Sequence, residues 1–309
     1  MPVNTVIQVD DINLKLSNLD KVFYADGFSK GDVIDYYIRI APALLAHIKD
    51  RPMTLKRYPH GADSNFFYQK SCPANKPDWF NTLSVWSEGR GAHIHFCLLD
   101  SLPSLIWVAN MAALELHPSL SRADNISCPS VMVFDLDPGP PASMTECAEV
   151  GLMLRAILDS YGLTSYPKTS GSKGLQIYVP LNTPCGYEQT KQFSHFLAKS
   201  LEAHRPDIVV AKMKKSLRTG KVFFDWSQND EHKTTVSVYS LRAKARPSAS
   251  APVSWQEVEA VYEQQDPHLI DFDCRQVLER FEKYGDLFAP VLSVKQALPT
   301  IGASVDYNN

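Results

Sequence analysis

The sequence predicts an α+β fold with mostly antiparallel sheets. Strand-like and helix-like segments alternate along all 309 residues, with no internal repeat and no low-complexity tract. No linker rich in Gly, Ser or Pro separates two independent parts. A chain that is 44% hydrophobic and 21% charged can bury a substantial core. We therefore expect one large domain or two closely packed subdomains.

The first half of the chain is expected to contain two helices and several strands. Residues 29–49 place their apolar side chains on one helical face, with Ser29 as the cap and Pro42 as the position of a kink. Three segments are expected to be extended, namely 53–58, 65–69 and 92–98. Residues 101–116 read as a mostly buried helix that runs into His117.

The second half begins with an apolar strand, VMVFDLD, at residues 131–137. Ser143 and Glu146 form a capping-box pattern ahead of a helix that is expected to end near Tyr161, where Gly162 supplies the stop. The remaining predicted elements are strands at 174–181, 208–211, 221–226 and 234–239 and helices at 187–204, 254–264 and 274–284.

Composition narrows the class of protein. The net charge of −3 gives no general attraction to nucleic acid, so any such contact must be local. No window approaches the roughly 18 apolar residues of a membrane helix, and the first residues lack a signal-peptide pattern, so we expect a cytoplasmic protein without membrane contact. The cysteines show no metal-binding spacing, and we expect reduced thiols at Cys72, Cys97, Cys128, Cys147, Cys185 and Cys274.

Two carboxylates stand at the end of the strand at 131–137. Alternation along the strand sends Asp135 and Asp137 to one sheet face, roughly 6.6 Å apart at their Cα atoms. They can share a divalent cation, because two carboxylates this close repel each other unless a cation or a proton intervenes. Aspartates beside Pro and Gly are also ordinary turn residues, so the pair alone leaves both interpretations open.

A third carboxylate, Asp225, follows the apolar run KVFFD. Two-metal phosphoryl transfer needs carboxylates that bridge two ions about 3.5–4 Å apart. The three aspartates suit that chemistry, on the condition that the fold brings Asp225 to the other two.

Residues 169–174, TSGSKG, connect two predicted strands and resemble a phosphate cradle. Their glycines permit close backbone approach, and their serines and lysine offer donors and positive charge. The spacing is not that of a P-loop, and a simple hairpin connection is the alternative. Basic residues also cluster at 212–221 and 242–246, where a solvated loop is the alternative to a DNA contact.

Eight stretches occur in order across nearly the whole chain: LSNLDKVFY, DVIDYY, LKRYPHGAD, ALELHPSLSR, VFDLDPG, TSGSKGLQIYVPL, KSLRTGKVFFDWSQN and VYSLRAKARP. Together they resemble the polymerase domain of bacterial ligase D, a member of the archaeo-eukaryotic primase superfamily that acts in non-homologous end joining. The resemblance implies a primase-polymerase fold over residues 1–309, in which two closely packed subdomains flank a central active-site cleft. It also implies that this chain contains no ligase or phosphoesterase module.

The resemblance assigns roles residue by residue. It implies that Asp135, Asp137 and Asp225 are catalytic and bind two Mn²⁺ or Mg²⁺ ions. It implies nucleotide contacts from Lys56, His117, Ser170, Gly171, Lys173, Gln176, Gln228 and Arg242. It implies DNA contacts from Lys21 and Lys30, which match a 5′-phosphate pocket, and from Arg57, Phe67, Tyr68, Lys70, Lys215, Arg218 and Lys221. Phe67 and Tyr68 match a pair that stacks on template bases, although one of two adjacent strand residues could instead be buried.

Two positions depart from the family pattern. Gln176 stands where the family usually has His, which replaces a possible imidazolium near the nucleotide phosphates with a neutral amide. Tyr68 stands where Phe is usual, which keeps the stacking face and adds a hydroxyl. Neither change touches the three aspartates.

The resemblance implies a DNA-directed nucleotidyltransferase that adds NTPs, with ribonucleotides preferred over dNTPs, to the 3′-OH at gaps and double-strand break ends. A 5′-phosphate would guide it, Ku and a DNA ligase would be its partners, and it would be associated with the nucleoid. The free protein is expected to be a monomer, with two copies meeting across a DNA synapse. The alternatives are a primase that starts chains without a primer, a non-catalytic DNA end-bridging module, and a glycosyltransferase that uses the Asp-x-Asp triplet.

Overall fold

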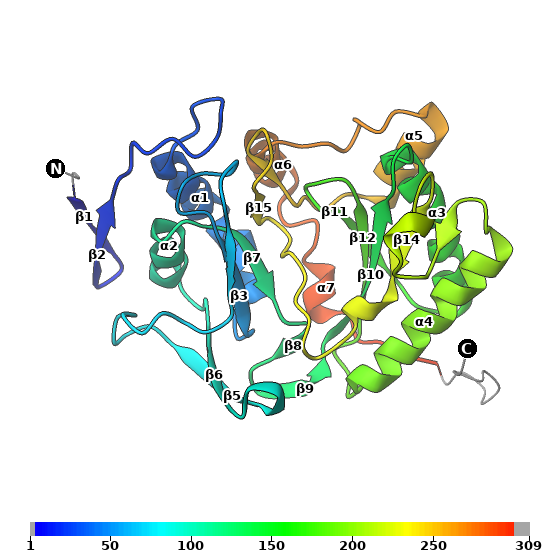
Figure 1. Cartoon of the computed structure of the whole chain (residues 1–309), viewed down its shortest axis with the longest axis horizontal. Helices are drawn as coiled ribbons and strands as arrows, with labels where there is room; N and C mark the ends of the chain where they lie inside the picture. Colours follow the sequence, from blue (N-terminus) through cyan, green and yellow to red (C-terminus); the bar gives the residue numbers. More distant parts are fainter. Residues whose placement is uncertain (1–3, 300–309) are drawn as a thin grey trace.

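The computed structural model describes residues 4–299 and has the expected α+β fold (Figure 1). The helices are α1 (Lys30–Ile48), α2 (Leu102–Asn110), α3 (Met144–Ser160), α4 (Tyr187–His204), α5 (Trp255–Gln264), α6 (Cys274–Tyr284) and α7 (Pro290–Ser293). The strands are β1 (Asn4–Val9), β2 (Ile12–Ser17), β3 (Met53–Arg57), β4 (Phe67–Gln69), β5 (Thr82–Ser87), β6 (Ala92–Cys97), β7 (Ala113–Pro118), β8 (Ser121–Arg122), β9 (Asn125–Pro129), β10 (Val131–Pro138), β11 (Tyr166–Thr169), β12 (Leu175–Pro180), β13 (Val209–Val210), β14 (Val222–Asp225), β15 (Leu241–Arg242) and β16 (Ser248–Ala249). No helix among these residues is long and apolar enough to span a membrane.

The N-terminal half is built on a sheet of order β4-β3-β6-β5, with β7 also paired to β3. Helix α1 is amphipathic, and its buried face includes Val33, Tyr37 and Leu44. The Tyr37 hydroxyl donates to the carbonyl of Leu114 on β7 at 2.8 Å, which ties the helix to this sheet. The expected cap is confirmed, because the Ser29 side chain accepts from the backbone N–H of Asp32 at 3.2 Å.

The C-terminal half is built on a second sheet of order β11-β12-β10-β14-β13, which lies on the right of Figure 1. Side chains alternate along β10: Phe134 and Leu136 pack into the core beneath α3 and α4. Val131 and Val133 face the other way, into the core shared with the N-terminal half. Asp135 and Asp137 continue the row of Val131 and Val133, so the two aspartates share one face as predicted, and this face changes from apolar to acidic only at the end of the strand.

Two predicted elements are wrong. The helix expected over 101–116 ends at Asn110, and Ala112 has a left-handed φ of 64° before strand β7 begins. Strand β7 is buried on both faces, so its side chains do not alternate between apolar and polar. Without that alternation, the sequence of a buried strand cannot be told from that of a buried helix. Residues 234–239 form no strand. They run alongside β7, but the hydrogen bonds between the two segments, such as Ser237 N–H to the Leu116 carbonyl at 2.9 Å, do not form a regular ladder.

The expectation of six reduced cysteines is also wrong. Cys72 and Cys97 form a disulfide with Cα atoms 5.0 Å apart. The Cys72 N–H donates to the carbonyl of His95 at 2.6 Å, which brings the loop after β4 against β6. The other four cysteines are free thiols. The pairing depends on this tertiary contact, since 25 positions separate the two residues.

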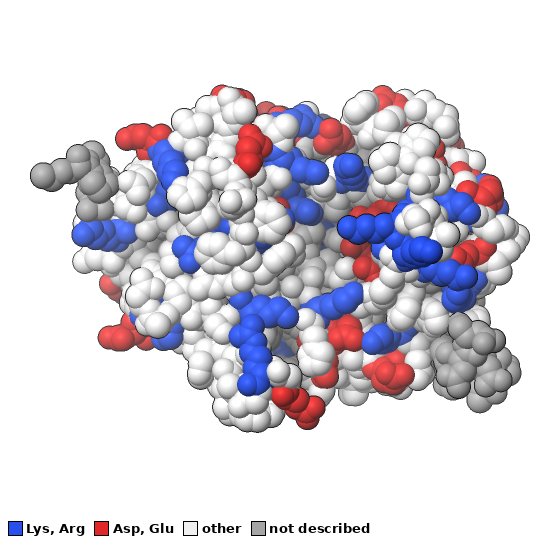
Figure 2. All heavy atoms as spheres, in the orientation of Figure 1, with Lys and Arg blue, Asp and Glu red and all other residues white. Residues whose placement is uncertain are grey.

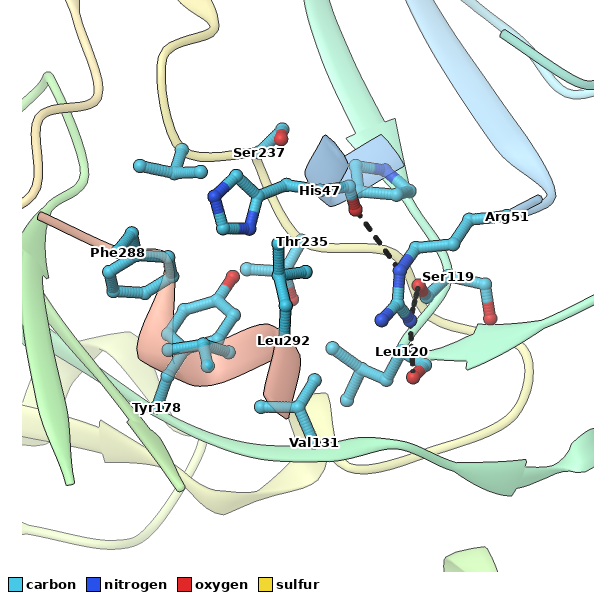
Figure 3. A pocket seen from close by; sticks show the side chains of 13 residues that line it. His47, Arg51, Ser119, Leu120, Val131, Tyr178, Thr235, Ser237, Phe288 and Leu292 are labelled. Atoms are coloured by element: carbon cyan, nitrogen blue, oxygen red, sulfur yellow. Dashed lines mark hydrogen bonds between the residues drawn. The ribbon is translucent and has the colours of Figure 1, made fainter. Parts of the chain in front are cut away.

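The two halves meet around a small cavity, shown in Figure 3. Arg51 crosses one wall and donates to the carbonyls of His47, Ser119 and Leu120, so its buried guanidinium is held by backbone. Phe288, next to α7, lies on the opposite wall. The cavity therefore marks where the end of the described chain closes against both halves.

Candidate active site between the two sheets

Strand register brings the three aspartates together. In the antiparallel pairing of β10 with β14, Asp135 lies directly opposite Asp225, and Asp137 lies opposite Phe223. Paired residues project from the same face of a sheet. The expectation that Asp225 joins the other two carboxylates is therefore confirmed in position.

Asp225 and Asp135 both accept hydrogen bonds from neighbouring donors. Asp225 Oδ1 accepts from the backbone N–H of Ser227 at 3.0 Å, and its Oδ2 accepts from Gln228 Nε2 at 2.9 Å. Gln176, opposite Asp135 on β12, donates from Nε2 to Asp135 Oδ1 at 3.0 Å. Gln176 thus contacts one of the three aspartates, so the expectation that this departure from the family pattern does not touch them is wrong.

The crowding of negative charge changes how these groups titrate. Burial and the charge of Asp137 raise the pKa of Asp135 to about 7, although the Gln176 hydrogen bond opposes the shift. Burial and the charge of Asp225 also raise the pKa of Asp137, against the opposing charges of Arg218 and Arg242. A cation bound here would favour the ionised carboxylates.

The donor set suits hard divalent cations. All three side chains offer carboxylate oxygens, which Mg²⁺ and Mn²⁺ prefer. Burial and mutual repulsion raise the pKa values of Asp135 and Asp137, and a bound cation would offset that repulsion. Within residues 4–299, no three His, Cys, Asp or Glu side chains converge closely enough to hold an ion as they stand. Small side-chain rotations of Asp135, Asp137 and Asp225 would therefore accompany binding.

A second row of side chains on the N-terminal sheet is organised by Glu115. Its carboxylate is buried and receives Lys56 Nζ at 3.2 Å, the Tyr58 hydroxyl at 3.0 Å and His117 Nε2 at 3.0 Å. Arg242 Nε lies 3.3 Å away. Burial alone would raise the pKa of Glu115, but the His117 hydrogen bond and the charges of Arg242 and Lys56 hold it well below the usual range.

Members of both rows line one open cleft. Its walls include Tyr68 and His117 from the N-terminal sheet and Asp135 and Asp137 from the C-terminal sheet. Arg242 joins the two sides, since it pairs with Glu115 and donates to the Ser170 carbonyl. Figure 2 shows Lys and Arg side chains gathered along the middle of this face, between the two halves. The cleft therefore places Lys and Arg side chains opposite carboxylates. The basic side chains suit an anionic ligand, and the carboxylates suit metal ions bound to that ligand.

The loop at 169–174 packs closely against the backbone of neighbouring segments. Ser170 Oγ accepts from the N–H groups of Ser172 and Gly174, which closes the loop on itself. A Cβ on Gly171 would stand 2.6 Å from the Ala249 carbonyl carbon, and one on Gly174 would stand 2.3 Å from the Leu136 carbonyl oxygen. Ser170 lines the cleft, whereas Gly171 and Lys173 line a neighbouring pocket. The glycines thus serve close backbone packing.

The aromatic pair lies on β4, with both rings exposed. Phe67 is 45% exposed and Tyr68 is 59% exposed, so neither is a core residue. Each ring has a basic residue as its register partner on β3: Lys56 lies opposite Tyr68, and Arg57 lies opposite Phe67. Lys56 donates to Glu115 on one face of the sheet, whereas Arg57 donates to the Met111 carbonyl and to the side chain of Gln69 on the other face.

The other expected DNA-binding residues differ in where their side chains lie. Arg218 stacks on Phe223, 3.5 Å from the ring centre, and thereby lies beside the carboxylate strand. Lys215 is exposed, and Lys221 turns away to donate to the Pro206 carbonyl. Lys70 lines the cleft.

Lys21 and Lys30 form a separate basic pair. The Lys30 N–H donates to the Lys21 carbonyl at 2.8 Å, and the Lys30 ammonium is buried, donating to the Ser17 carbonyl at 2.5 Å. Lys21 donates to the Pro59 carbonyl at 2.6 Å. Burial and the charge of Lys21 lower the pKa of Lys30 to about 8.

Sequence reasoning missed two charged residues of this site. Glu115 interrupts an apolar run, and a carboxylate at such a position signals buried partners. Lys168 on β11 is also fully buried and lies on the row of Asp135. It precedes the Gly-rich loop, and no local pattern marks it as a functional residue.

Comparison with known proteins supplies a family for this architecture. Residues 29–288 match the family model described as LigD, primase-polymerase domain. A multifunctional non-homologous end joining protein LigD from Mycolicibacterium smegmatis is 40% identical over 281 residues, which cover 90% of this chain and 36% of the relative. A bifunctional LigD from Bacillus subtilis is 34% identical over 274 residues, which cover 88% of this chain and 43% of the relative.

A solved structure has the same overall fold. The polymerase domain of Mycobacterium tuberculosis ligase D in complex with DNA superposes with a TM-score of 0.84 at 38% identity, covering 92% of this chain and 99% of that one. The described chain thus matches a whole polymerase domain, while it spans about a third of the length of the mycobacterial relative.

Proposed function

Because the chain belongs to the LigD primase-polymerase domain family, a family of polymerase-type nucleotidyltransferases, we propose that it transfers nucleoside monophosphates from NTPs to a DNA 3′-OH. The chain would act as a single primase-polymerase domain at gaps and double-strand break ends, with ribonucleotides preferred. The observation that carries this proposal is the register that aligns Asp135 with Asp225, because Asp135 lines a cleft that Lys70 and Arg242 also line.

The proposed metal ligands are Asp135, Asp137 and Asp225. Two Mn²⁺ or Mg²⁺ ions, when bound, would stabilise negative charge on the phosphoryl oxygens as the bond to pyrophosphate breaks. Gln176 and Gln228 orient two of these carboxylates through their amide N–H groups. These bonds would limit the rotation that the two carboxylates need to reach an ion.

The proposed nucleotide ligands lie on the opposite wall. Lys56, His117 and Arg242 share the Glu115 carboxylate, which holds their donors within one cluster. Lys and Arg form strong charge-assisted hydrogen bonds with phosphate oxygens. These cations would therefore neutralise the triphosphate and the departing pyrophosphate, while the exposed rings of Phe67 and Tyr68 would stack on template bases.

The proposed DNA contacts explain how an acidic protein could hold a DNA end. A dianionic 5′-phosphate at Lys21 and Lys30 would form short charge-assisted bonds, and Lys70, Lys215 and Arg218 would add contacts nearer the cleft. As the biological setting, we propose nucleoid-associated end joining with Ku and a DNA ligase. Two copies would meet across a synapse.

Primer extension on a gapped duplex with a 5′-phosphate tests this function. The wild-type protein should add NTPs in Mn²⁺ or Mg²⁺, and Asp137→Ala should lower the rate at least ~100-fold because a metal ligand is lost. Glu282→Gln, which alters an exposed ion pair with Arg39 far from the cleft, should leave the rate unchanged. Full activity in Asp137→Ala would refute the metal assignment, and dinucleotide synthesis without a primer would identify a primase.

A further inference from the structure

Lys168 is a fully buried lysine that the proposed function leaves without a role. Strand register places it opposite Gln176, which in turn lies opposite Asp135. Burying an ammonium is costly unless its N–H groups find acceptors. The partners of Lys168 therefore indicate what the buried charge does.

These partners form a directed chain of hydrogen bonds that ends at a proposed metal ligand. Lys168 Nζ donates to Gln176 Oε1 at 2.5 Å and to Ser250 Oγ at 2.8 Å. Ser250 uses its own hydrogen to donate to the Thr169 carbonyl at 2.7 Å, so it accepts from Lys168. Gln176 Nε2 donates to Asp135 Oδ1 at 3.0 Å.

Lys168 determines the direction in which these hydrogen bonds run. Burial lowers the pKa of Lys168 well below its usual range, and the charge of Asp135 opposes that shift. An amide side chain can point either end toward a neighbour, but the charged lysine carries donors alone. Lys168 therefore selects the orientation in which the Gln176 oxygen faces the lysine and its NH₂ group faces Asp135. The reversed amide would set its oxygen against the Asp135 carboxylate and its NH₂ group against the ammonium.

We propose that Lys168 is a positioning residue for the carboxylate site: acting through the Gln176 amide, it fixes the Asp135 carboxylate for a divalent ion. Asp135 Oδ1 is held by the amide, and Oδ2 has no hydrogen-bond partner among residues 4–299, which suits it to face an ion. The inference rests on the proposed function, since it assumes that Asp135 binds the ion. Groups behind a metal ligand commonly change metal affinity by ~10–100-fold when they are lost.

Manganese binding in the absence of nucleotide tests the inference without relying on activity. Lys168→Met keeps the length of the side chain and removes its donors, so the Kd for Mn²⁺, measured by electron paramagnetic resonance, should rise roughly 10-fold. Thermal unfolding shows whether the variant is folded. The double variant Lys168→Met/Gln176→Met replaces both partners with apolar groups, which a core tolerates better than one unpaired group, and should show the same weakening.

Two matched variants separate positioning from packing. Ser250→Ala removes the other partner of Lys168 but keeps its bridge to Gln176, so Mn²⁺ affinity should stay within ~2-fold even if stability falls. In Lys168→Met/Gln176→His, the imidazole can adopt the tautomer that donates to Asp135 without help from a lysine. This variant should recover most of the lost affinity.

The outcomes are distinguishable. Wild-type Mn²⁺ affinity in a folded Lys168→Met protein, or in the folded double methionine variant, would overturn the inference and leave the proposed function standing. Equal weakening in Ser250→Ala would overturn it as well, because the effect would then follow packing. A wild-type protein that neither binds Mn²⁺ nor extends a primer would overturn the proposed function and the inference together.

Discussion

Single buried charges organise both walls of the cleft. Glu115 gathers donors on the N-terminal side, and Lys168 supports the carboxylates on the C-terminal side through Gln176. Both side chains are almost completely buried, so their partners cannot be replaced by water without rearrangement. The residues that touch substrate are therefore only the outer part of the site.

Glu115→Gln should reduce both stability and nucleotide binding. The change keeps the size of the side chain but leaves Lys56, His117 and Arg242 without their shared counter-charge, which should lower the free energy of unfolding by about 3 kcal/mol. The KM for NTP should rise, because the donors lose their common anchor. Urea unfolding and steady-state extension measure the two effects.

The matched control is Glu259→Gln, which removes an exposed ion pair with Arg155. Exposed pairs contribute little, so this variant should stay within about 1 kcal/mol of wild type. Equal stability and equal KM in Glu115→Gln would contradict the organising role of Glu115.

Lys30 should make recognition of a 5′-phosphate sensitive to pH. Its pKa of about 8 lies below that of an ordinary lysine, so the ammonium is lost as pH rises from about 7 to about 9, while the phosphate is already dianionic. The preference for a 5′-phosphorylated gap over a 5′-hydroxyl gap should fall across this window. Fluorescence anisotropy at constant ionic strength measures it.

Lys30→Met provides the comparison, since a residue that cannot titrate should give a weak preference that is flat with pH. A preference that stays constant in the wild-type protein from about pH 7 to about pH 9 would exclude Lys30 as the titrating contact.

Among the elements, the hairpin of β11 and β12 positions the site most directly. Its loop lies against β10 so closely that Gly174 leaves no space for a side chain. Gly174→Ala would set a Cβ 2.3 Å from the Leu136 carbonyl oxygen and 3.2 Å from Asp137 Oδ1. The hairpin must then shift away from the aspartate strand.

We expect Gly174→Ala to lower the free energy of unfolding by about 2 kcal/mol and to remove most of the extension activity, because the clashing atom belongs to the backbone and cannot rotate away. Gly89→Ala is the control, since a Cβ there meets no atom within 4 Å and its φ is not left-handed. Urea unfolding of both variants decides the point. A neutral Gly174→Ala would show that the loop adapts easily.

Local signals in the sequence predicted the elements that local physics determines. Caps at Ser29 and Ser143, the stop at Gly162 and the alternation in β10 are all confirmed. The segment at 113–118 failed because its strand is buried on both faces, which removes the alternating pattern.

For the site, the sequence supplied the residue types but could not supply their pairings. The contact of Asp225 with Asp135 depends on register between strands nearly 90 residues apart in sequence, and only family resemblance suggested it. The Gln176 bond to Asp135, the Glu115 cluster and the Cys72–Cys97 disulfide are likewise tertiary contacts. No local pattern encodes such contacts, because they depend on how separate elements pack.

At the scale of the whole molecule, Asp286 joins the end of the described chain to both halves. Its carboxylate contacts His47 Nε2 at 2.8 Å at the end of α1, and accepts from the Tyr239 hydroxyl at 2.7 Å. It also accepts from the N–H of Phe288, which leads into α7. Burial would raise the pKa of Asp286, but the contact with His47 lowers it.

Asp286→Asn should therefore destabilise the protein most at neutral pH. A carboxyl with a lowered folded-state pKa adds stability above its unfolded value, about pH 4, and loses that stability as pH falls through the folded value. The variant should lose about 1–2 kcal/mol at pH 7, and the difference should shrink in acid. Urea unfolding at several pH values tests this, and a difference that grows in acid would contradict it.

The row formed by Lys168, Gln176, Asp135 and Asp225 draws one side chain from each of four neighbouring strands. A slip of one residue in any strand would turn that strand's member to the opposite face of the sheet. Such a molecule would not bind metal ions more weakly; it would lack the proposed site altogether. Metal binding would therefore distinguish molecules with the correct strand register from misregistered ones. The metal ion would then report on correct folding of the sheet as well as take part in the reaction.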